Sequence, residues 1–257
     1  MKNKSTEVVE AKGFNVADFS ADVPDFLKDK IDDDRGNEGV GSEDMTVPRL
    51  ELVQSLSAVR KKNDPAYIEG IQEGDLYNNI TREIYGQEVF FVPVAFKKEY
   101  LLWRDQKLGG GFGGAFEDSQ EAAAVKMGQE KPEEWEVVDT NQHFGLLISP
   151  ESGQIIEAVV SMAKSKAKVS RHFNSLVRLN GGARFSRIYR IRGIQDQNQQ
   201  GQDFYNIAID NIGYVNEDLY KRAESFYELL QSGKVTADRS YEEATSSDDA
   251  QQEHSEF

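Results

Sequence analysis

The stretch EVFFVPVAFKKEYLLWR, residues 88–104, constrains the fold more than any other part of the chain. Phe90, Val92, Val94 and Phe96 occupy every second position and would share one face of a β-strand. Pro93 cannot donate a hydrogen bond to a neighbouring strand. The stretch therefore predicts a long strand that lies at a sheet edge or carries a bulge.

Most of the remaining patterns also predict strands. Candidate strands occupy residues 46–56, 74–80, 134–140, 143–149 and 154–163, and residues 183–194 and 202–212 form a predicted hairpin. Helices are predicted near 119–128, at 165–180 before Gly181 and Gly182, and from Asn216 to Gly233. Because strands and helices do not alternate regularly, a doubly wound sheet is disfavoured. We expect a β-rich α+β fold, with a small OB-like barrel and inserted helices.

Charge divides the chain into a body and two arms. Of the net charge of −15, residues 1–44 carry −6 and residues 238–257 carry another −6. We expect a disordered acidic arm at 1–44, a core domain at 45–233 and a disordered acidic tail at 234–257. The chain has no cysteine, no apolar run of membrane-spanning length and no apolar signal segment. These features favour a soluble cytoplasmic protein, in the host cytoplasm if a phage encodes it.

Signatures of catalysis are missing from the sequence. The three histidines, His143, His172 and His254, form no pair with metal-ligand spacing. The GGGFGG segment lacks the Lys-Ser/Thr ending of a phosphate-binding loop. We expect no enzymatic activity, cofactor or metal, and keep an enzyme with an unrecognised site as an alternative.

Residues 158–194 contain nine basic side chains and no acidic one. In the predicted helix, an arc of about 80° holds four of these cations, and the apolar residues Val169, Phe173, Leu176 and Val177 lie opposite. In the following strand, Arg184, Arg190 and Arg192 would point one way, and Phe185, Arg187, Tyr189 and Ile191 the other. Such a run is typical of a nucleic-acid footprint, although a solvated face or structural ion pairs are the alternative. The candidate DNA-binding residues here are Lys164, Lys168, Arg171, Arg178, Arg184, Arg187, Tyr189, Arg190 and Arg192.

A second candidate segment covers residues 97–116, where cations alternate with aromatic rings. Aromatic faces can stack on bases while cations follow the phosphates, and glycines would let a loop fold over a strand of nucleic acid. The alternative is that these aromatic residues belong to the core. The candidate residues are Lys97, Lys98, Tyr100, Trp103, Arg104, Lys107, Phe112 and Phe116.

The last residues, SSDDAQQEHSEF, form a polar acidic tail that ends in an aromatic residue. This tail resembles those of single-stranded DNA-binding proteins from bacteria and tailed phages. The resemblance implies that the tail recruits replication and recombination proteins and competes with DNA for a basic groove. It rests on Asp248, Asp249, Glu253, Glu256 and Phe257.

Together these patterns predict a phage protein that binds single-stranded DNA of any base sequence and needs no membrane. They are compatible with a homo-oligomer. Two other classes remain open. A recombination protein that anneals single strands would show the same basic groove. A phage structural or assembly protein would use the basic segment to contact packaged DNA or an acidic neighbour.

Overall fold

The computed structural model describes residues 46–198, 200–232 and 236–237, together with Asp25 and Arg35. The chain divides into two units, residues 1–40 and 41–257, and the strands and helices given below belong to the second. The two predicted arms, 1–44 and 234–257, lie almost entirely outside the described residues.

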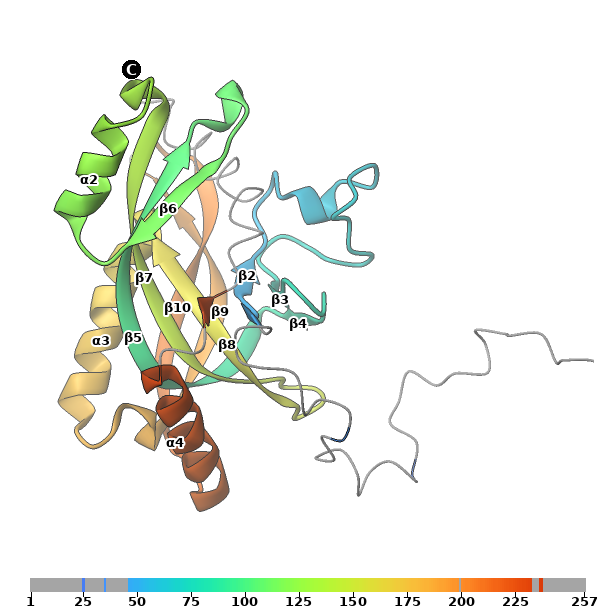
Figure 1. Ribbon diagram of the computed structural model, residues 1–257. Helices are drawn as coiled ribbons and strands as arrows, with labels where there is room; N and C mark the ends of the chain where they lie inside the picture. Colours follow the sequence, from blue (N-terminus) through green and yellow to red (C-terminus); the bar gives the residue numbers. More distant parts are fainter. Residues whose placement is uncertain (1–24, 26–34, 36–45, 199, 233–235, 238–257) are drawn as a thin grey trace, which may run out of the picture. The chain divides into compact units, whose positions relative to one another are not determined.

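A six-stranded antiparallel sheet forms the centre of the described fold (Figure 1). Its order is β10 (Asp203–Tyr214), β9 (Arg187–Gln197), β5 (Glu88–Arg104), β7 (Trp135–Ile148) and β8 (Ile155–Ala163). Strand β6 (Phe112–Phe116) pairs with the far half of β5. The long strand and the β9–β10 hairpin were predicted correctly, whereas the two strands predicted at 134–140 and 143–149 are one continuous strand, β7.

Strand β5 carries a bulge close to its middle. Pro93 pairs with Gly145 and Ala95 pairs with Phe144, so that Val94 is an extra residue in the ladder. A side chain at Gly145 would collide with the carbonyl oxygen of Val92, so the close approach of the strands here requires glycine. Of the two predicted explanations for Pro93, an edge or a bulge, the bulge is therefore confirmed, and β5 itself lies between β9 and β7.

The two faces of the sheet belong to two hydrophobic clusters. The α3 face carries Phe91, Leu147, Val160, Tyr189 and Ile191, which pack in one cluster with helix α3 (Ala167–Asn180). The α4 face carries Val92, Val94, Phe144, Leu146 and Val159, which pack in another with helix α4 (Glu217–Gln231). Burial of these side chains is the main stabilising contribution to the domain.

The helices begin and end at residues that favour helix termini. Helix α2 (Ser119–Met127) starts at Asp118, whose carboxylate accepts from two backbone N–H groups, and α4 starts at Asn216, which accepts from Leu219 N. A 3-10 turn, η6 (Lys164–Lys166), leads into α3, and Gly181 ends α3 with a φ of 66°. The three predicted helices are therefore present, with small shifts at their ends.

Smaller elements flank the main sheet. Strands β2 (Leu50–Leu52), β3 (Leu76–Asn78) and β4 (Ile84–Gly86) form a second sheet, and β1 (Thr46–Val47) pairs with β11 (Thr236–Ala237). The 3-10 turns are η3 (Ala58–Arg60), η4 (Gln106–Leu108), η5 (Pro132–Glu134) and η7 (Arg184–Ser186).

The strand-rich α+β class is confirmed, but the OB-like barrel is not. In the described residues, no strand pairing joins β8 to β10, so the main sheet is open. Isolated contacts lie at the two strands beside this opening. Arg49 forms a β-bridge to Val159 of β8. The side-chain amide of Gln54 donates to the backbone oxygen of Tyr205 in β10 and accepts from its backbone N–H. None of the described helices has the length and apolar character needed to cross a membrane.

Candidate nucleic-acid interface

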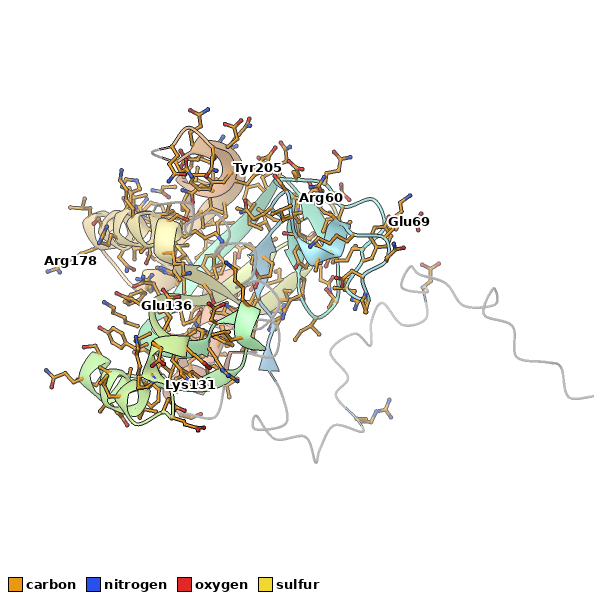
Figure 2. All side chains as sticks on the ribbon, turned by 90° about the horizontal axis from the view of Figure 1, so that it is seen from above. Arg60, Glu69, Lys131, Glu136, Arg178 and Tyr205 are labelled. Carbon is orange, nitrogen blue, oxygen red and sulfur yellow. The ribbon has the colours of Figure 1, made fainter. Side chains whose placement is uncertain are left out.

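The outer side of α3 exposes three cations: Lys168, Arg171 and Arg178. The opposite side of α3 packs on the sheet through Val169, Phe173, Leu176 and Val177, as the helical spacing predicts. Figure 2 shows Arg178 extending from α3 away from the sheet. The ion pairs of the described residues include none of these three cations.

Arg184 is a fourth cation beside α3, and it lies largely inside the protein. Its Nη2 atom donates to Nδ1 of His143 at 2.9 Å and to Oδ1 of Asn174 at 2.8 Å. Its guanidinium carbon lies 5.7 Å from the ring centres of both Phe96 and Phe173. Within the described part of the chain, no carboxylate forms an ion pair with Arg184.

The surroundings of Arg184 leave its positive charge uncompensated. Burial lowers the pKa of Arg184 to about 10, so the guanidinium remains protonated at neutral pH. His143 is fully buried, and burial followed by the Arg184 charge lowers its pKa to about 3. A guanidinium can only donate, so Nδ1 of His143 accepts, and Nε2 carries the ring proton toward Ser170 Oγ at 2.8 Å.

Arg184 joins the exposed cations of α3 into one basic surface. Asn174, which accepts from Arg184, lies three residues after Arg171 and four before Arg178, so all three share one side of the helix. Phe96, on the α3 face of β5, contacts Arg184 and keeps 39% of its surface exposed. We call this set the α3 surface: Phe96, Lys168, Arg171, Asn174, Arg178 and Arg184.

Other cations of the acid-free run lie elsewhere. Arg192 Nη2 is 2.7 Å from Asp210 Oδ2, and Arg190 approaches both Asp210 and Glu88. These are the structural ion pairs that the sequence left open as an alternative. Arg184 does not share a strand with Arg190 and Arg192, because residues 184–186 form η7 and β9 begins only at Arg187. Lys164 lies before α3 and pairs with Glu136 at 3.7 Å.

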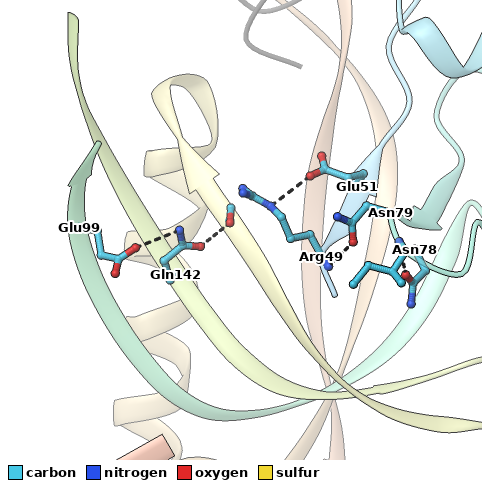
Figure 3. A network of polar contacts seen from close by, with 8 residues as sticks. Arg49, Glu51, Asn78, Asn79, Glu99 and Gln142 are labelled. Carbon is cyan, nitrogen blue, oxygen red and sulfur yellow. Dashed lines mark hydrogen bonds and ion pairs between the residues drawn. The ribbon is translucent and has the colours of Figure 1, made fainter. Parts of the chain in front are cut away.

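Lys97 belongs to the opposite side of the sheet from the α3 surface. Its ammonium lies 3.3 Å from Glu99 and 3.0 Å from Glu117. Glu99, only 4% exposed, accepts from Gln142, which in turn accepts from the Ser161 hydroxyl. Figure 3 shows this network beside a second polar group, in which Arg49 approaches Glu51 at 3.3 Å.

The other cations of residues 97–116 either have acidic neighbours or lie away from the α3 surface. Lys98 lies 2.8 Å from Asp139, which raises the pKa of the lysine, and its ammonium is 5.2 Å from the Tyr100 ring. Arg104 Nε donates to Glu134 at 3.0 Å. Lys107 is exposed on η4, beyond the end of β5.

Most of the candidate aromatic residues are packed rather than free. Trp103 is 8% exposed and its ring lies 4.8 Å from that of Phe112, which is 37% exposed. Only the second half of the glycine-rich segment is strand β6, and residues 109–111 form the turn before it. Tyr100 of β5 pairs with Phe116 of β6, and both are half-buried. Tyr189 is fully buried against Phe173, at 5.0 Å between ring centres, and is therefore a core residue.

Four residues near the basic surface were not found from the sequence: Phe96, His143, Asn174 and Tyr214. Phe96 and His143 looked like strand residues, and Asn174 like an ordinary helix position. Tyr214 lies beside Arg187, whose Nη2 donates to its hydroxyl at 2.6 Å. Only the position of Arg184 in the acid-free run was a signal for this neighbourhood.

The proposed partner-binding residues Asp248, Asp249, Glu253, Glu256 and Phe257 lie outside the described residues. Within the part of the chain that is described, no group of His, Asp and Glu side chains is arranged to hold a metal ion.

Comparison with models of known protein families gives a match over most of the chain. The model of a family described as Pam3 phage gp34-like protein matches residues 12–236, which include the whole main sheet and all three helices α2, α3 and α4. The match ends before the acidic segment 238–257. Neither the curated proteins nor the solved structures contain a match.

Proposed function

The chain belongs to the Pam3 phage gp34-like family, and we propose that it binds single-stranded DNA of a phage through the α3 surface. The observation that carries the proposal is a group of cations that form no ion pair among the described residues, in a protein of net charge −15. Lys168, Arg171 and Arg178 are exposed on α3, and Arg184 lies beside them without an ion pair to any carboxylate of the described residues.

The electrostatic argument supports a polyanion as the ligand. Most lysines and arginines of the main sheet, such as Lys98, Arg104 and Arg192, are paired with carboxylates and are already neutralised. Like charges on one helix face repel one another unless an anion lies between them. A phosphate backbone satisfies this requirement, because each cation that contacts it releases a condensed counterion.

The aromatic neighbour of Arg184 favours a single strand. Phe96 presents an exposed ring next to the buried guanidinium, and unpaired bases can stack on such a ring, whereas bases in a duplex cannot. Stacking and phosphate contacts do not select a sequence, so binding is expected to be nonspecific. The proposal needs only this open surface and does not depend on a closed OB barrel.

Fluorescence anisotropy with a labelled oligo-dT and with a duplex of equal length, at several salt concentrations, tests the proposal. Lys168→Ala with Arg171→Ala should weaken binding of the single strand. If both cations contact phosphates, the slope of log K against log salt should flatten by about 1.4, or 0.7 for each contact.

Lys61→Ala with Lys62→Ala is the matched control, because it removes the same charge from exposed positions elsewhere. Arg60, the neighbour of these lysines, and Arg178 lie on opposite sides of Figure 2. The control should leave the salt slope unchanged. The proposal is rejected if the protein does not bind oligo-dT at low salt, or if the two double variants weaken binding equally. Equal affinity for oligo-dT and for the duplex would reject the preference for single strands.

The acidic segment 238–257 has a place in the same proposal. It carries −6 and is tethered to the domain that holds the α3 surface. Covalent attachment of a binding segment gives an effective concentration on the order of millimolar, so this segment would compete with DNA for the cations. We propose that it also contacts replication or recombination proteins when DNA displaces it. A pull-down with and without residues 246–257 tests the second role.

A further inference from the structure

We propose that Tyr214, backed by Arg187, is a second stacking platform that holds one nucleobase of the bound single strand. The inference rests on the proposed function, since it assigns a base-binding residue to the same ligand. Its basis is an aromatic ring that is exposed and nevertheless fixed in position.

Two contacts with Arg187 fix the Tyr214 ring. Arg187 Nη2 donates to the phenolic oxygen at 2.6 Å, and the guanidinium carbon lies 4.0 Å from the ring centre. An arginine stacked on a tyrosine is a favourable cation–π arrangement. The guanidinium therefore covers one side of the ring and orients it.

The rest of the ring is open to solvent. Tyr214 is 72% exposed, which leaves a large part of its surface without a protein neighbour. A ring held on one side and free on the other needs little further ordering when a flat ligand binds, so less conformational entropy is lost. A nucleobase on the free side would form a stack of base, tyrosine and guanidinium. Both components of that stack tolerate any base.

The platform lies at the end of the α3 surface. Arg187 is on the α3 face of β9 together with Tyr189 and Ile191, and Arg184, the first residue of the turn η7, precedes it by only three residues. Asn180, the last residue of α3, donates to the Tyr189 hydroxyl at 3.2 Å, which ties the end of the helix to this strand. Two Arg–aromatic pairs, Arg184 with Phe96 and Arg187 with Tyr214, thus lie near α3.

Arg187 is also available as a cation. No ion pair of the described residues involves it, in contrast to Arg190 and Arg192 on the other face of the same strand. Its Nε atom is buried without a hydrogen-bond partner, while Nη2 is engaged by the tyrosine. The charge can therefore favour a phosphate that lies next to the stacked base.

Paired measurements on oligo-dT and on an abasic oligonucleotide of equal length separate stacking from charge. Tyr214→Ala should weaken binding of oligo-dT by about 5- to 150-fold, the range for the loss of one base–aromatic stack. It should leave affinity for the abasic strand within about twofold, because that strand keeps its phosphates but has no base. Tyr214→Phe keeps the ring and should retain most of the affinity.

Leu179→Ala is the control, since Leu179 is an 85% exposed apolar side chain on α3 that has no ring. It should affect neither oligonucleotide. If wild-type protein binds oligo-dT but Tyr214→Ala changes both affinities equally or not at all, the platform is wrong and the proposed function stands. In that case the exposed ring is better explained by a protein contact together with Ile212. If wild-type protein binds neither strand, the proposed function itself fails.

Discussion

Nη2 of Arg184 lies 2.9 Å from Nδ1 of His143, so a permanent cation is held against an imidazole that must stay neutral. Protonation of His143 would place two positive charges side by side inside the protein and would remove the acceptor of the arginine. The neutral histidine thus positions the guanidinium toward Phe96 and Asn174 without cancelling its charge.

The free energy of unfolding should decrease as the pH falls through the range in which His143 is protonated only in the unfolded chain. The pKa of His143 is lowered from 6.5 to about 3 by burial and by the Arg184 charge. The contribution is complete above pH 6.5 and is lost as the pH falls toward 3, by at most about 1.4 kcal/mol per pH unit. Denaturant unfolding of wild type and His143→Gln between pH 7 and 5 measures it. The variant should show a flatter dependence, and parallel curves would contradict the assignment.

Arg190→Ala with Arg192→Ala should change single-strand affinity by less than about twofold at moderate salt, where distant charges are screened. Both arginines are paired with Asp210 on the face of β9 opposite to Arg187. The measurement is the same anisotropy titration used for the α3 variants. A loss of affinity as large as that of Lys168→Ala with Arg171→Ala would mean that the DNA path runs over this side of the sheet.

Trp103→Ala should destabilise the fold rather than remove a stacking contact. Trp103 is 8% exposed and packs against Phe112, so its removal leaves a cavity that should cost about 3–5 kcal/mol of the free energy of unfolding. Urea unfolding measures the loss. A stable variant with weakened oligo-dT binding would instead support the sequence-based hypothesis that Trp103 stacks on a base.

Neutralising the acidic segment should strengthen DNA binding. Replacing Asp248, Asp249, Glu253 and Glu256 with Asn or Gln keeps the length and removes four of the charges that we propose compete with DNA for the α3 surface. The gain should be largest at low salt and should vanish as salt screens the contact. Titrations at two salt concentrations measure the gain in DNA affinity. A variant in which Gln251 and Gln252 are changed to Ala is the control. Weaker DNA binding after neutralisation would contradict competition.

Periodicity predicted much of the secondary structure because it reports directly on burial. Strand β5 has the predicted bounds, and α3 buries the predicted apolar side, because both patterns depend on neighbours along one element. The prediction that Phe96 shares a face with Val92 and Val94 is wrong, because the bulge turns Phe96 toward α3. The merging of two predicted strands into β7 and the open arrangement of the sheet depend on contacts between distant segments. Alternation along a single strand does not carry that information.

The site was predicted only where the residues are close in sequence. Lys168, Arg171 and Arg178 fall on one side of a helix by spacing alone. Arg190 and Arg192 were assigned with them because the sequence does not reveal that Asp210 lies across the hairpin. Phe96 and Tyr214 reach the basic surface through strand pairing and a turn, so no local pattern marks them as neighbours of Arg184 and Arg187.

The extra residue in β5 also sorts charges between the two sides of the sheet. With Val94 bulged out, Phe96 pairs with His143 and faces α3, whereas Glu99 pairs with Thr140 and faces the other way. An unbroken ladder would reverse the parity of every later residue, so that Phe96 would turn away and Glu99 would point to the side that holds Arg184. A carboxylate there would neutralise the guanidinium. One inserted residue in a strand thus prevents an ion pair, because it keeps Glu99 and Arg184 on opposite sides of the sheet.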